Sequence, residues 1–279
     1  MPIAYGLWRY GRDDLGQMQT MVAAARELGI DHFDTADVYG YPEVGAAERL
    51  LGALRDKAPS LLEGAEIATK AGVDIGTPYN ASRAYIEKAI DASLERLQTN
   101  CIDLFYIHRP DMLAHPAETA AALDAIIASG KAKSLGVSNY APEQIKSLNA
   151  FLQTPLSAHQ VEFSTLHVNP AADGVFDQAM ANDMRVYAWS PLGGGRLFTD
   201  GDTQSKRVRY VLSDIAERYE CSPMAAALAF VMTHPAGVRP ILGTSNPSRL
   251  KDAVSAENIR LDRKDWYALY QASTGEKLP

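Results

Sequence analysis

Four side chains of complementary chemical types stand where we expect the ends of three successive strands. They are Asp34, Tyr39, Lys70 and His108. A phenol with an ordinary pKa of about 10 is a weak acid at neutral pH, and a neighbouring ammonium group lowers that pKa by stabilising the phenolate. A carboxylate can hold the ammonium in place, and a histidine can hydrogen-bond a substrate carbonyl. Together these residues predict a site that donates a proton to a carbonyl oxygen.

Each of these residues also has an ordinary structural interpretation. A tyrosine in a loop is most often a packing or surface residue, and Asp34 followed by Thr35 could simply cap a helix. Lys70 at a strand end would normally be solvated, and His108 would more often be a hydrogen-bonded structural histidine. Their joint occurrence at consecutive strand ends favours the catalytic interpretation.

The elements that must position these residues alternate between short apolar runs and longer helical patterns. Eight runs are predicted to be strands: Ile3–Gly6, Asp31–Asp34, Glu66–Lys70, Asp103–His108, Ser134–Ser138, Ala158–Glu162, Arg185–Ser190 and Arg239–Leu242. Most begin roughly 25–40 residues after the previous run, which is room for one strand and one helix. The longer gap before the last strand predicts an additional loop or helix.

Helix signals occur between these strands. Ser82 suits the N-cap of a helix, and Pro116, Pro142 and Pro247 each suit the first turn of one. Strict alternation of strands and helices indicates an α/β fold with a parallel sheet covered by helices. Eight such units favour a closed (β/α)8 TIM barrel over an open doubly wound sheet, which the pattern alone leaves open. Since no Pro/Gly/Ser-rich linker interrupts the chain, we expect one domain over residues 1–279.

Charge and cysteine content argue against several classes of protein. A net charge of −7 at pH 7 lacks the basic surplus that is typical of nucleic-acid binders. Cys101 and Cys221 are interpreted as thiols in a reducing compartment. The sequence shows neither a signal-peptide pattern nor a run of 18 apolar residues. We therefore expect a cytoplasmic protein that binds neither nucleic acid nor membrane.

Other catalytic motifs do not occur in the sequence. We find no GxGxxG after a strand, no GxxxxGK[ST], no HExxH, no paired CxxC and no GxSxG. The six histidines are scattered along the chain, so no metal site is expected.

Seven segments resemble the aldo-keto reductase superfamily, in its single-domain bacterial form. They are FDTADVYG (33–40), ATK (68–70), DLFYIHRPD (103–111), GVSNY (136–140), QVEFS (160–164), AWSPLGGGRL (188–197) and PILGTSNPSRL (240–250). The resemblance covers nearly the whole chain, and the order and spacing of the segments are specific. It implies an NAD(P)H-dependent oxidoreductase that reduces aldehydes and ketones to alcohols, or catalyses the reverse. The implied roles are general acid for Tyr39, tuning of its pKa for Lys70 and Asp34, and substrate orientation for His108.

The resemblance also implies the cofactor contacts. They are Ser138, Asn139, Gln160, Trp189, Ser190, Leu192, Gly194, Arg196, Gly243, Thr244, Ser245 and Arg249. The first three would hold the nicotinamide carboxamide, and the tryptophan would stack on its ring. Barrels often bind phosphate in the loops after strands seven and eight, where glycines let backbone N–H groups approach an anion.

A basic side chain at the phosphate end favours NADPH, although NADH could also bind. Arg249 falls in the first turn of a helix that begins after Asn246, where helix N–H groups and a cation suit a 2′-phosphate. The alternative is that the glycines form a flexible lid and Arg249 is a surface charge. Many family members carry a lysine just after the last strand. Gly243 stands there instead, which weakens the preference for NADPH.

The substrate pocket is expected to have an aromatic wall and to be incompletely closed. Trp8 joins Trp189 in the wall, and Arg109 either offers a cation at the rim or pairs with Asp111. An N-terminal hairpin common in the family is missing, and the tail after a helix over Arg263–Ala272 is short. We expect broad, modest activity on small reactive carbonyls such as aromatic aldehydes and α-dicarbonyls.

A non-catalytic function on the same scaffold is the alternative. A cofactor-binding sensor or regulatory subunit would keep the barrel without needing a proton donor. The complete set of four catalytic types favours the enzyme. The resemblance further implies a monomer whose partner is a small carbonyl or alcohol substrate.

Overall fold

The computed structural model describes residues 1–40, 43–199 and 201–279. Its strands follow one another in chain order as a closed barrel, which confirms the predicted fold and excludes the open sheet. The strands are β1 (Ala4–Gly6), β2 (His32–Asp34), β3 (Glu66–Ala71), β4 (Leu104–Ile107), β5 (Leu135–Ser138), β6 (Leu156–Glu162), β7 (Arg185–Trp189) and β8 (Arg239–Leu242). Their bounds differ from the predicted ones by one or two residues at most, and β8 has the predicted bounds.

Helices follow the strands, and those predicted from Ser82, Pro116, Pro142, Pro247 and Arg263 begin where the sequence placed them. They are α1 (Leu15–Glu27), α2 (Ala46–Lys57), α3 (Arg83–Leu97), α4 (Pro116–Ala128), α5 (Pro142–Asn149), α6 (Val175–Ala181), α7 (Thr203–Arg218), α8 (Pro223–Thr233), α9 (Pro247–Ser255) and α10 (Arg263–Thr274). Short 3-10 turns are η1 (Pro59–Leu61), η2 (Asn169–Ala171), η3 (Gly193–Phe198) and η4 (Ala256–Asn258). The long gap between β7 and β8 holds η3, α7 and α8, as its length predicted.

The described residues divide by their internal contacts into two compact units. One unit is Ala4–Gln160, and the other joins Met1–Ile3 to Val161–Pro279. The interpretation of residues 1–279 as one domain stays a prediction.

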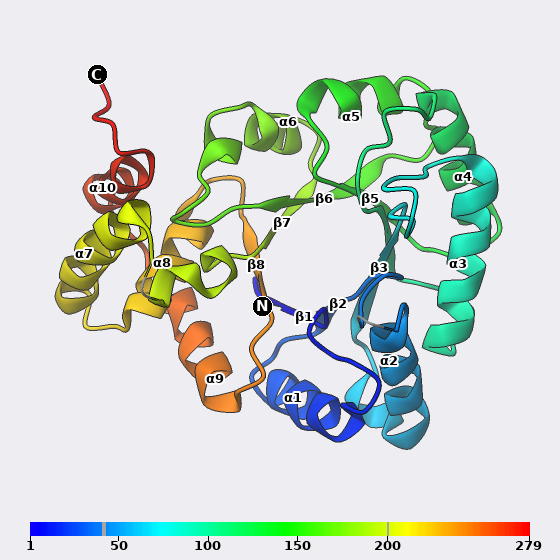
Figure 1. The fold of residues 1–279 in the computed structure, drawn as a ribbon, viewed down its shortest axis with the longest axis horizontal. Helices are drawn as coiled ribbons and strands as arrows, with labels where there is room; N and C mark the ends of the chain where they lie inside the picture. The colour runs from blue at the N-terminus through cyan, green and yellow to red at the C-terminus, as the bar shows by residue number, and fades with distance from the viewer. Residues whose placement is uncertain (41–42, 200) are drawn as a thin grey trace. The chain divides into compact units, whose positions relative to one another are not determined.

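In the unit of residues 4–160, parallel strands pair in register and helices cover them. Lys70 of β3 stands opposite Tyr106 of β4, and Ser138 of β5 stands opposite Gln160 of β6. Helices α2 and α3 pack side by side along the strands (Figure 1). Gly52 permits this close approach, because a Cβ there would collide with the carbonyl oxygen of Arg96.

The second unit has an aromatic cluster of its own. Trp266 of α10 stacks on Phe230 of α8 at 4.9 Å, and its indole N–H donates to the Phe230 carbonyl over 3.1 Å. Phe163 in turn stacks on Phe230 at 5.5 Å and meets Phe176 edge-on at 4.8 Å. Such pairs add stability beyond the apolar area that they bury. They fix α8 and α10 against the segment that follows β6.

A buried histidine on β6 has no described hydrogen-bond partner. His159 is fully buried, and within the described residues neither ring nitrogen makes a hydrogen bond. Its neighbour Gln160 bonds to Asp34 in the barrel interior, so His159 points to the opposite face of the sheet. Burial lowers the pKa of His159 to about 4.

We predict a pH-dependent contribution of His159 to stability. The unfolded pKa is about 6.5, so the stability of the neutral ring is fully present above that pH and is lost as the pH falls towards about 4. Between pH 7 and pH 4, the free energy of unfolding of the wild type should fall by about 3 kcal/mol more than that of His159→Leu. Urea unfolding at both pH values measures this difference. Equal decreases in the two proteins would contradict it.

Candidate active site

The four predicted catalytic side chains come together within the unit of residues 4–160. Asp34 ends β2, Lys70 lies near the end of β3, and His108 follows β4. Tyr39 lies in the segment after β2, which is tied to β3 because the Asp37 N–H donates to the Lys70 carbonyl over 3.0 Å. The side chains thus meet at the carboxyl ends of the strands, where barrel enzymes place their chemistry.

The ammonium group of Lys70 connects these residues. Lys70 is fully buried, and its Nζ donates to Asp34 Oδ2 at 2.8 Å, to the Thr35 carbonyl at 2.6 Å and to Tyr39 Oη at 3.3 Å. Nζ also lies 4.8 Å from the centroid of the Tyr39 ring. Because the phenol oxygen accepts this hydrogen bond, its own O–H is the group that can donate to a substrate.

Burial and neighbouring charges have opposing effects on the pKa values of Tyr39 and Lys70. Burial raises the pKa of Tyr39 and outweighs the opposing effect of Lys70. Burial alone would lower the pKa of Lys70, but Asp34 and Tyr39 reverse this, so the pKa of Lys70 is raised and the ammonium stays charged. The sequence predicted a lowered pKa for Tyr39. The net direction differs because the phenol hydroxyl lies against buried groups, which residue types alone do not reveal.

His108 is a neutral side chain beside the phenol. Its ring meets the Tyr39 ring edge-on at 5.8 Å. Burial lowers the pKa of His108 well below its ordinary value, and the charges of Lys70 and Arg109 lower it further. Its Nδ1 is buried and makes no hydrogen bond within the described residues. A neutral imidazole of this kind can donate a hydrogen bond without bringing a charge to the carbonyl.

Three predicted nicotinamide contacts lie beside this group. Gln160 Nε2 donates to Asp34 Oδ1 at 2.8 Å, and the Gln160 carbonyl accepts the Asn139 N–H at 2.9 Å. Asn139, in the left-handed region with φ of 59°, donates through Nδ2 to Ser138 Oγ at 2.7 Å. The Ser138 hydroxyl can therefore still donate, and the Gln160 side chain keeps its carbonyl oxygen as an acceptor. A carboxamide offers the complementary acceptor and donors, so these residues fit a nicotinamide.

Comparison with known proteins agrees with this geometry. Residues 2–273 match the Aldo/keto reductase family. The chain belongs to the aldo/keto reductase family. A 6-dehydroglucose reductase of Novosphingobium aromaticivorans is 42% identical over 283 residues, covering 100% of this chain and 93% of that protein. A 6-dehydroglucose reductase of Agrobacterium fabrum is 35% identical, covering 99% and 95%.

A solved structure shares the fold of this aldo/keto reductase. The crystal structure of a thermostable aldo-keto reductase in complex with the inhibitor epalrestat superposes with a TM-score of 0.84 at 22% identity, covering 98% of this chain and 95% of that one. The family and its named reductases make this chain an oxidoreductase that interconverts carbonyl compounds and alcohols with a nicotinamide cofactor. The alternative of a non-catalytic sensor finds no support.

The glycine-rich loop of this aldo/keto reductase belongs to the second unit. Gly194 and Gly195 have φ of 66° and 96°, and a Cβ at either would meet nothing within 4 Å. There is therefore room beside Gly194 and Gly195 for an anion to approach, although the Gly195 N–H already donates to the Leu192 carbonyl at 3.1 Å, whereas a Cβ on Gly193 would collide with Leu166. Predicted cofactor residues flank the loop: Trp189 at the end of β7, Ser190 with φ of 48°, and Leu192 just before η3.

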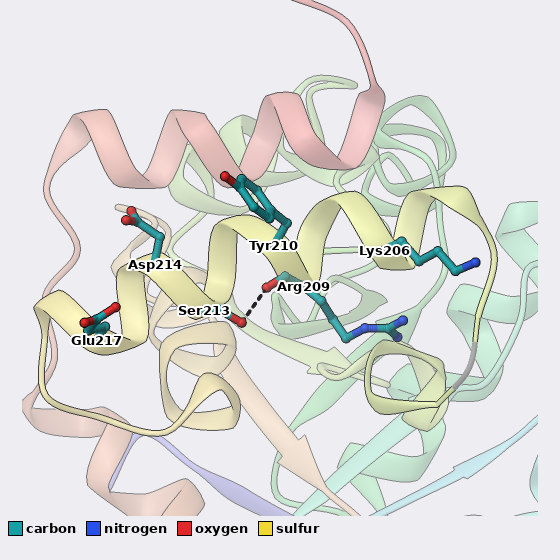
Figure 2. A pocket seen from close by; sticks show the side chains of 6 residues that line it. All are labelled: Lys206, Arg209, Tyr210, Ser213, Asp214 and Glu217. Atoms are coloured by element: carbon teal, nitrogen blue, oxygen red, sulfur yellow. Dashed lines mark hydrogen bonds between the residues drawn. The ribbon is translucent and has the colours of Figure 1, made fainter.

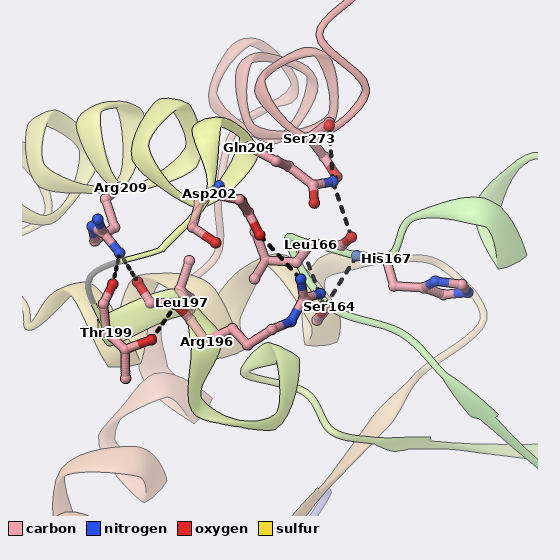
Figure 3. Close-up of polar contacts among 11 residues, drawn as sticks. Ser164, Leu166, His167, Arg196, Leu197, Thr199, Asp202, Gln204, Arg209 and Ser273 are labelled. Atoms are coloured by element: carbon pink, nitrogen blue, oxygen red, sulfur yellow. Dashed lines mark hydrogen bonds and ion pairs between the residues drawn. The ribbon is translucent and has the colours of Figure 1, made fainter.

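Polar contacts fix the chain after the glycines (Figure 3). Arg196 forms an ion pair with Asp202 at 3.2 Å. Arg209 Nη1 donates to the carbonyls of Leu197 at 3.0 Å and Thr199 at 2.5 Å. Arg196, a predicted cofactor contact, is thus held by a carboxylate at the exposed surface.

The loop after β8 has the predicted form. Gly243, Thr244 and Ser245 lead to Asn246, whose side chain accepts the Ser248 N–H at 2.9 Å and caps α9. Arg249 is exposed in the first turn of this helix. The contacts of these loop residues with a cofactor stay predictions.

The expected substrate residues differ in their surroundings. Trp8 is 56% exposed, and the Arg9 guanidinium lies 4.9 Å from its ring centroid, so one face of the expected aromatic wall is covered by a cation. Asp111 accepts the N–H groups of Ala81 and Leu113, each at 2.9 Å, and so joins the loops after β3 and β4. The charge of Arg109 has a lowering effect on the pKa values of Tyr39 and His108, and its two interpretations, a cation at the rim or a partner of Asp111, stay predictions.

Sequence reasoning missed two features of the reductase. Met112 and Leu113 are 86% and 97% exposed in the loop after β4, and no periodicity indicates their position. The fully buried Glu48 on α2 forms an ion pair at 2.6 Å with the partly buried Arg96 on α3. The signal for that pair was a glutamate three residues before Leu51 on the apolar face of a helix.

Helix α7 of the second unit carries a surface feature of its own. Six side chains of α7 line an open hollow with charges of both signs (Figure 2): Lys206, Arg209, Tyr210, Ser213, Asp214 and Glu217. In the described part of the chain, we find no cluster of three or more His, Cys, Asp or Glu side chains that could hold a metal ion. In the same residues, no helix has the length and apolar character that a membrane span requires. Cys101 and Cys221 are free thiols, as predicted.

Proposed function

We propose that Tyr39 is the general acid of the carbonyl reduction and that Lys70, Asp34 and His108 support it. The observation that carries this assignment is the Lys70 ammonium, which donates to Asp34 and to the phenol oxygen at the same time. A bound nicotinamide supplies or accepts the hydride. As negative charge develops on the carbonyl oxygen, the Tyr39 O–H donates its proton and Lys70 stabilises the phenolate that remains. Neutral His108 donates a hydrogen bond that orients the carbonyl. In the reverse direction the phenolate removes the proton of the alcohol.

We predict that Tyr39→Phe abolishes turnover while cofactor binding persists. The ring and its packing remain, and the variant lacks only the proton donor. Steady-state oxidation of NADPH with an aldehyde should fall by at least about 1,000-fold, since general acid catalysis contributes on the order of 10²–10⁴-fold. Cofactor titration by tryptophan fluorescence should give a Kd close to that of the wild type. Reduction at near-wild-type rates would disprove the assignment.

We further propose NADPH as the preferred cofactor. The residues that would hold its carboxamide are Ser138, Asn139 and Gln160, and Arg249 with the N-terminus of α9 would bind the 2′-phosphate. The exposed position of Arg249 supports this, and a relative in Schizosaccharomyces pombe, 28% identical over 281 residues, is named aldo-keto reductase yakc [NADP(+)]. A cytoplasmic, monomeric protein remains the prediction from the sequence.

We predict that Arg249→Ala weakens NADPH binding by roughly tenfold, the loss of one charge-assisted contact, and leaves NADH binding almost unchanged. Fluorescence titration with both cofactors measures the two Kd values. Lys251→Ala, a substitution of an exposed cation two residues along α9, is the matched control. Equal losses for both cofactors would show that Arg249 acts on the fold of α9 and would give more weight to Gly243 in place of the lysine.

We propose a hydroxylated aldehyde as the preferred substrate. Two relatives, 42% and 35% identical, are named 6-dehydroglucose reductase. The cations of Arg9, over Trp8, and Arg109, beside Tyr39, suit hydroxyl groups better than a wholly aromatic wall does. This narrows the broad range expected from the sequence.

We predict that kcat/KM for 6-dehydroglucose exceeds that for benzaldehyde and methylglyoxal by at least about tenfold. Hydrogen-bonding groups in the site discriminate by that amount or more when the substrate hydroxyls are missing. Steady-state kinetics with the three aldehydes and NADPH measures the ratio. Equal values across the panel would favour the open, unselective pocket instead.

A further inference from the structure

A second group of buried charges lies next to Lys70 along β3. Glu48 of α2 is fully buried, and its Oε1 accepts the Thr69 hydroxyl of β3 at 2.5 Å. Its Oε2 accepts Arg96 Nε of α3 at 2.6 Å. Successive side chains of a strand point to opposite faces, so Thr69 faces the helices while Lys70 faces the barrel interior. One glutamate therefore anchors the strand that carries the catalytic lysine.

Helices α2 and α3 have side chains and glycines that accommodate Arg96, the partner of Glu48. Arg96 Nη2 donates to Ser93 Oγ at 3.1 Å within α3. A Cβ on Gly45 would collide with the Arg96 side chain, and a Cβ on Gly52 would collide with the Arg96 carbonyl oxygen. Glycines at both positions leave room for the arginine between α2 and α3. The ion pair of Glu48 and Arg96 is thus part of the packing of the two helices.

A second carboxyl group faces the same cluster. Asp37 is 6% exposed, lies two residues before Tyr39, and makes no described hydrogen bond through Oδ1. The groups that act on it come from every packed element: Glu48 from α2, Arg96 from α3 and Lys70 from β3. The pKa of Tyr85 on α3 is in turn raised by burial and by the charge of Asp37. Burial and then the charge of Glu48 raise the pKa of Asp37 to about 8, against the opposing effects of Arg96, a hydrogen bond from the Val38 backbone and Lys70.

We propose that Glu48 is a positioning residue for the proton transfer, which acts on Lys70 mechanically through Thr69 and electrostatically through Asp37. The proposal rests on the roles proposed above for Tyr39 and Lys70. The hydrogen bond to Thr69 fixes the strand, and with it the position of the ammonium on the phenol oxygen. The charge of Glu48 pairs with that of Arg96, and the protonated form of Asp37 is therefore favoured. Lys70 then pairs with the carboxylate of Asp34.

The electrostatic effect of Asp37 on the rate of reduction has a definite direction. If Asp37 ionised, a second negative charge near Lys70 would weaken the stabilisation of the Tyr39 phenolate. Tyr39 would then be a weaker acid and the reduction would slow. Glu48 prevents this at neutral pH. As the pH rises through about 8, Asp37 ionises and the reductive kcat should decline.

The test compares pH profiles of kcat for NADPH-dependent reduction in four variants. In Glu48→Gln the amide oxygen can still accept from Thr69, but the charge is gone. Asp37 should replace it as the counterion of Arg96, and the decline should move from about pH 8 to a pH lower by about one unit or more. Asp37→Asn, alone and combined with Glu48→Gln, should lack the decline. Glu48→Asp, which restores the charge, should restore its position. KM should change little in each.

The control is Glu95→Gln, the same substitution at an exposed residue adjacent to Arg96. It should keep the wild-type profile. A carboxyl ¹³C NMR titration of Asp37, identified by its absence in Asp37→Asn, reads the same ionisation without turnover and should move to lower pH in Glu48→Gln.

Two results would overturn the proposal. One is a Glu48→Gln profile that is lower at every pH but unchanged in shape, which would make Glu48 merely structural. The other is an Asp37 titration that does not move. If instead Tyr39→Phe retained activity, the proposed function itself would fail, whereas an inactive Tyr39→Phe with an unshifted Glu48→Gln profile would reject the positioning role alone.

Discussion

A buried ammonium that must satisfy its hydrogen bonds determines the arrangement of this site. Removing Lys70 from water is costly unless its charge is paired and its N–H groups find acceptors. Asp34, the Thr35 carbonyl and the Tyr39 hydroxyl provide those acceptors. Because all three belong to β2 or the segment after it, the lysine can be buried only if β2 and β3 keep their register. The requirement that stabilises the charge therefore also places it on the phenol.

The second oxygen of Asp34 extends this constraint to β6. Gln160 donates to Asp34 Oδ1, and the Gln160 carbonyl receives the Asn139 N–H. The side chains that fit a nicotinamide are therefore oriented by the same carboxylate that holds Lys70. On the opposite face of β3, Glu48 and Thr69 anchor the strand from the helices. The residues proposed as the proton donor and its support are thus held from both faces of one strand.

The sequence predicted the elements and the catalytic side chains but not their electrostatic environment. Alternating apolar runs and helix caps located the strands and the starts of five helices, because these signals are local. Asp34, Lys70 and His108 were found because their types are unusual at strand ends. Contacts such as Gln160 to Asp34, separated by 126 residues, leave no local signal. The raised pKa of Tyr39 was missed for the same reason, since burial is a tertiary property.

The most direct test of the central claim is the pKa of Tyr39 in the free enzyme. ¹³Cζ-tyrosine labelling gives a titration curve for each phenol, and the Tyr39 signal is identified by its absence in Tyr39→Phe. The structure assigns Lys70 a lowering effect on this pKa, opposed by burial. We predict that Lys70→Met raises the Tyr39 pKa above its wild-type value or moves it beyond the alkaline limit of the titration. A Tyr39 pKa that stays the same or falls in Lys70→Met would contradict the claim that the buried ammonium sets the acidity of the proton donor.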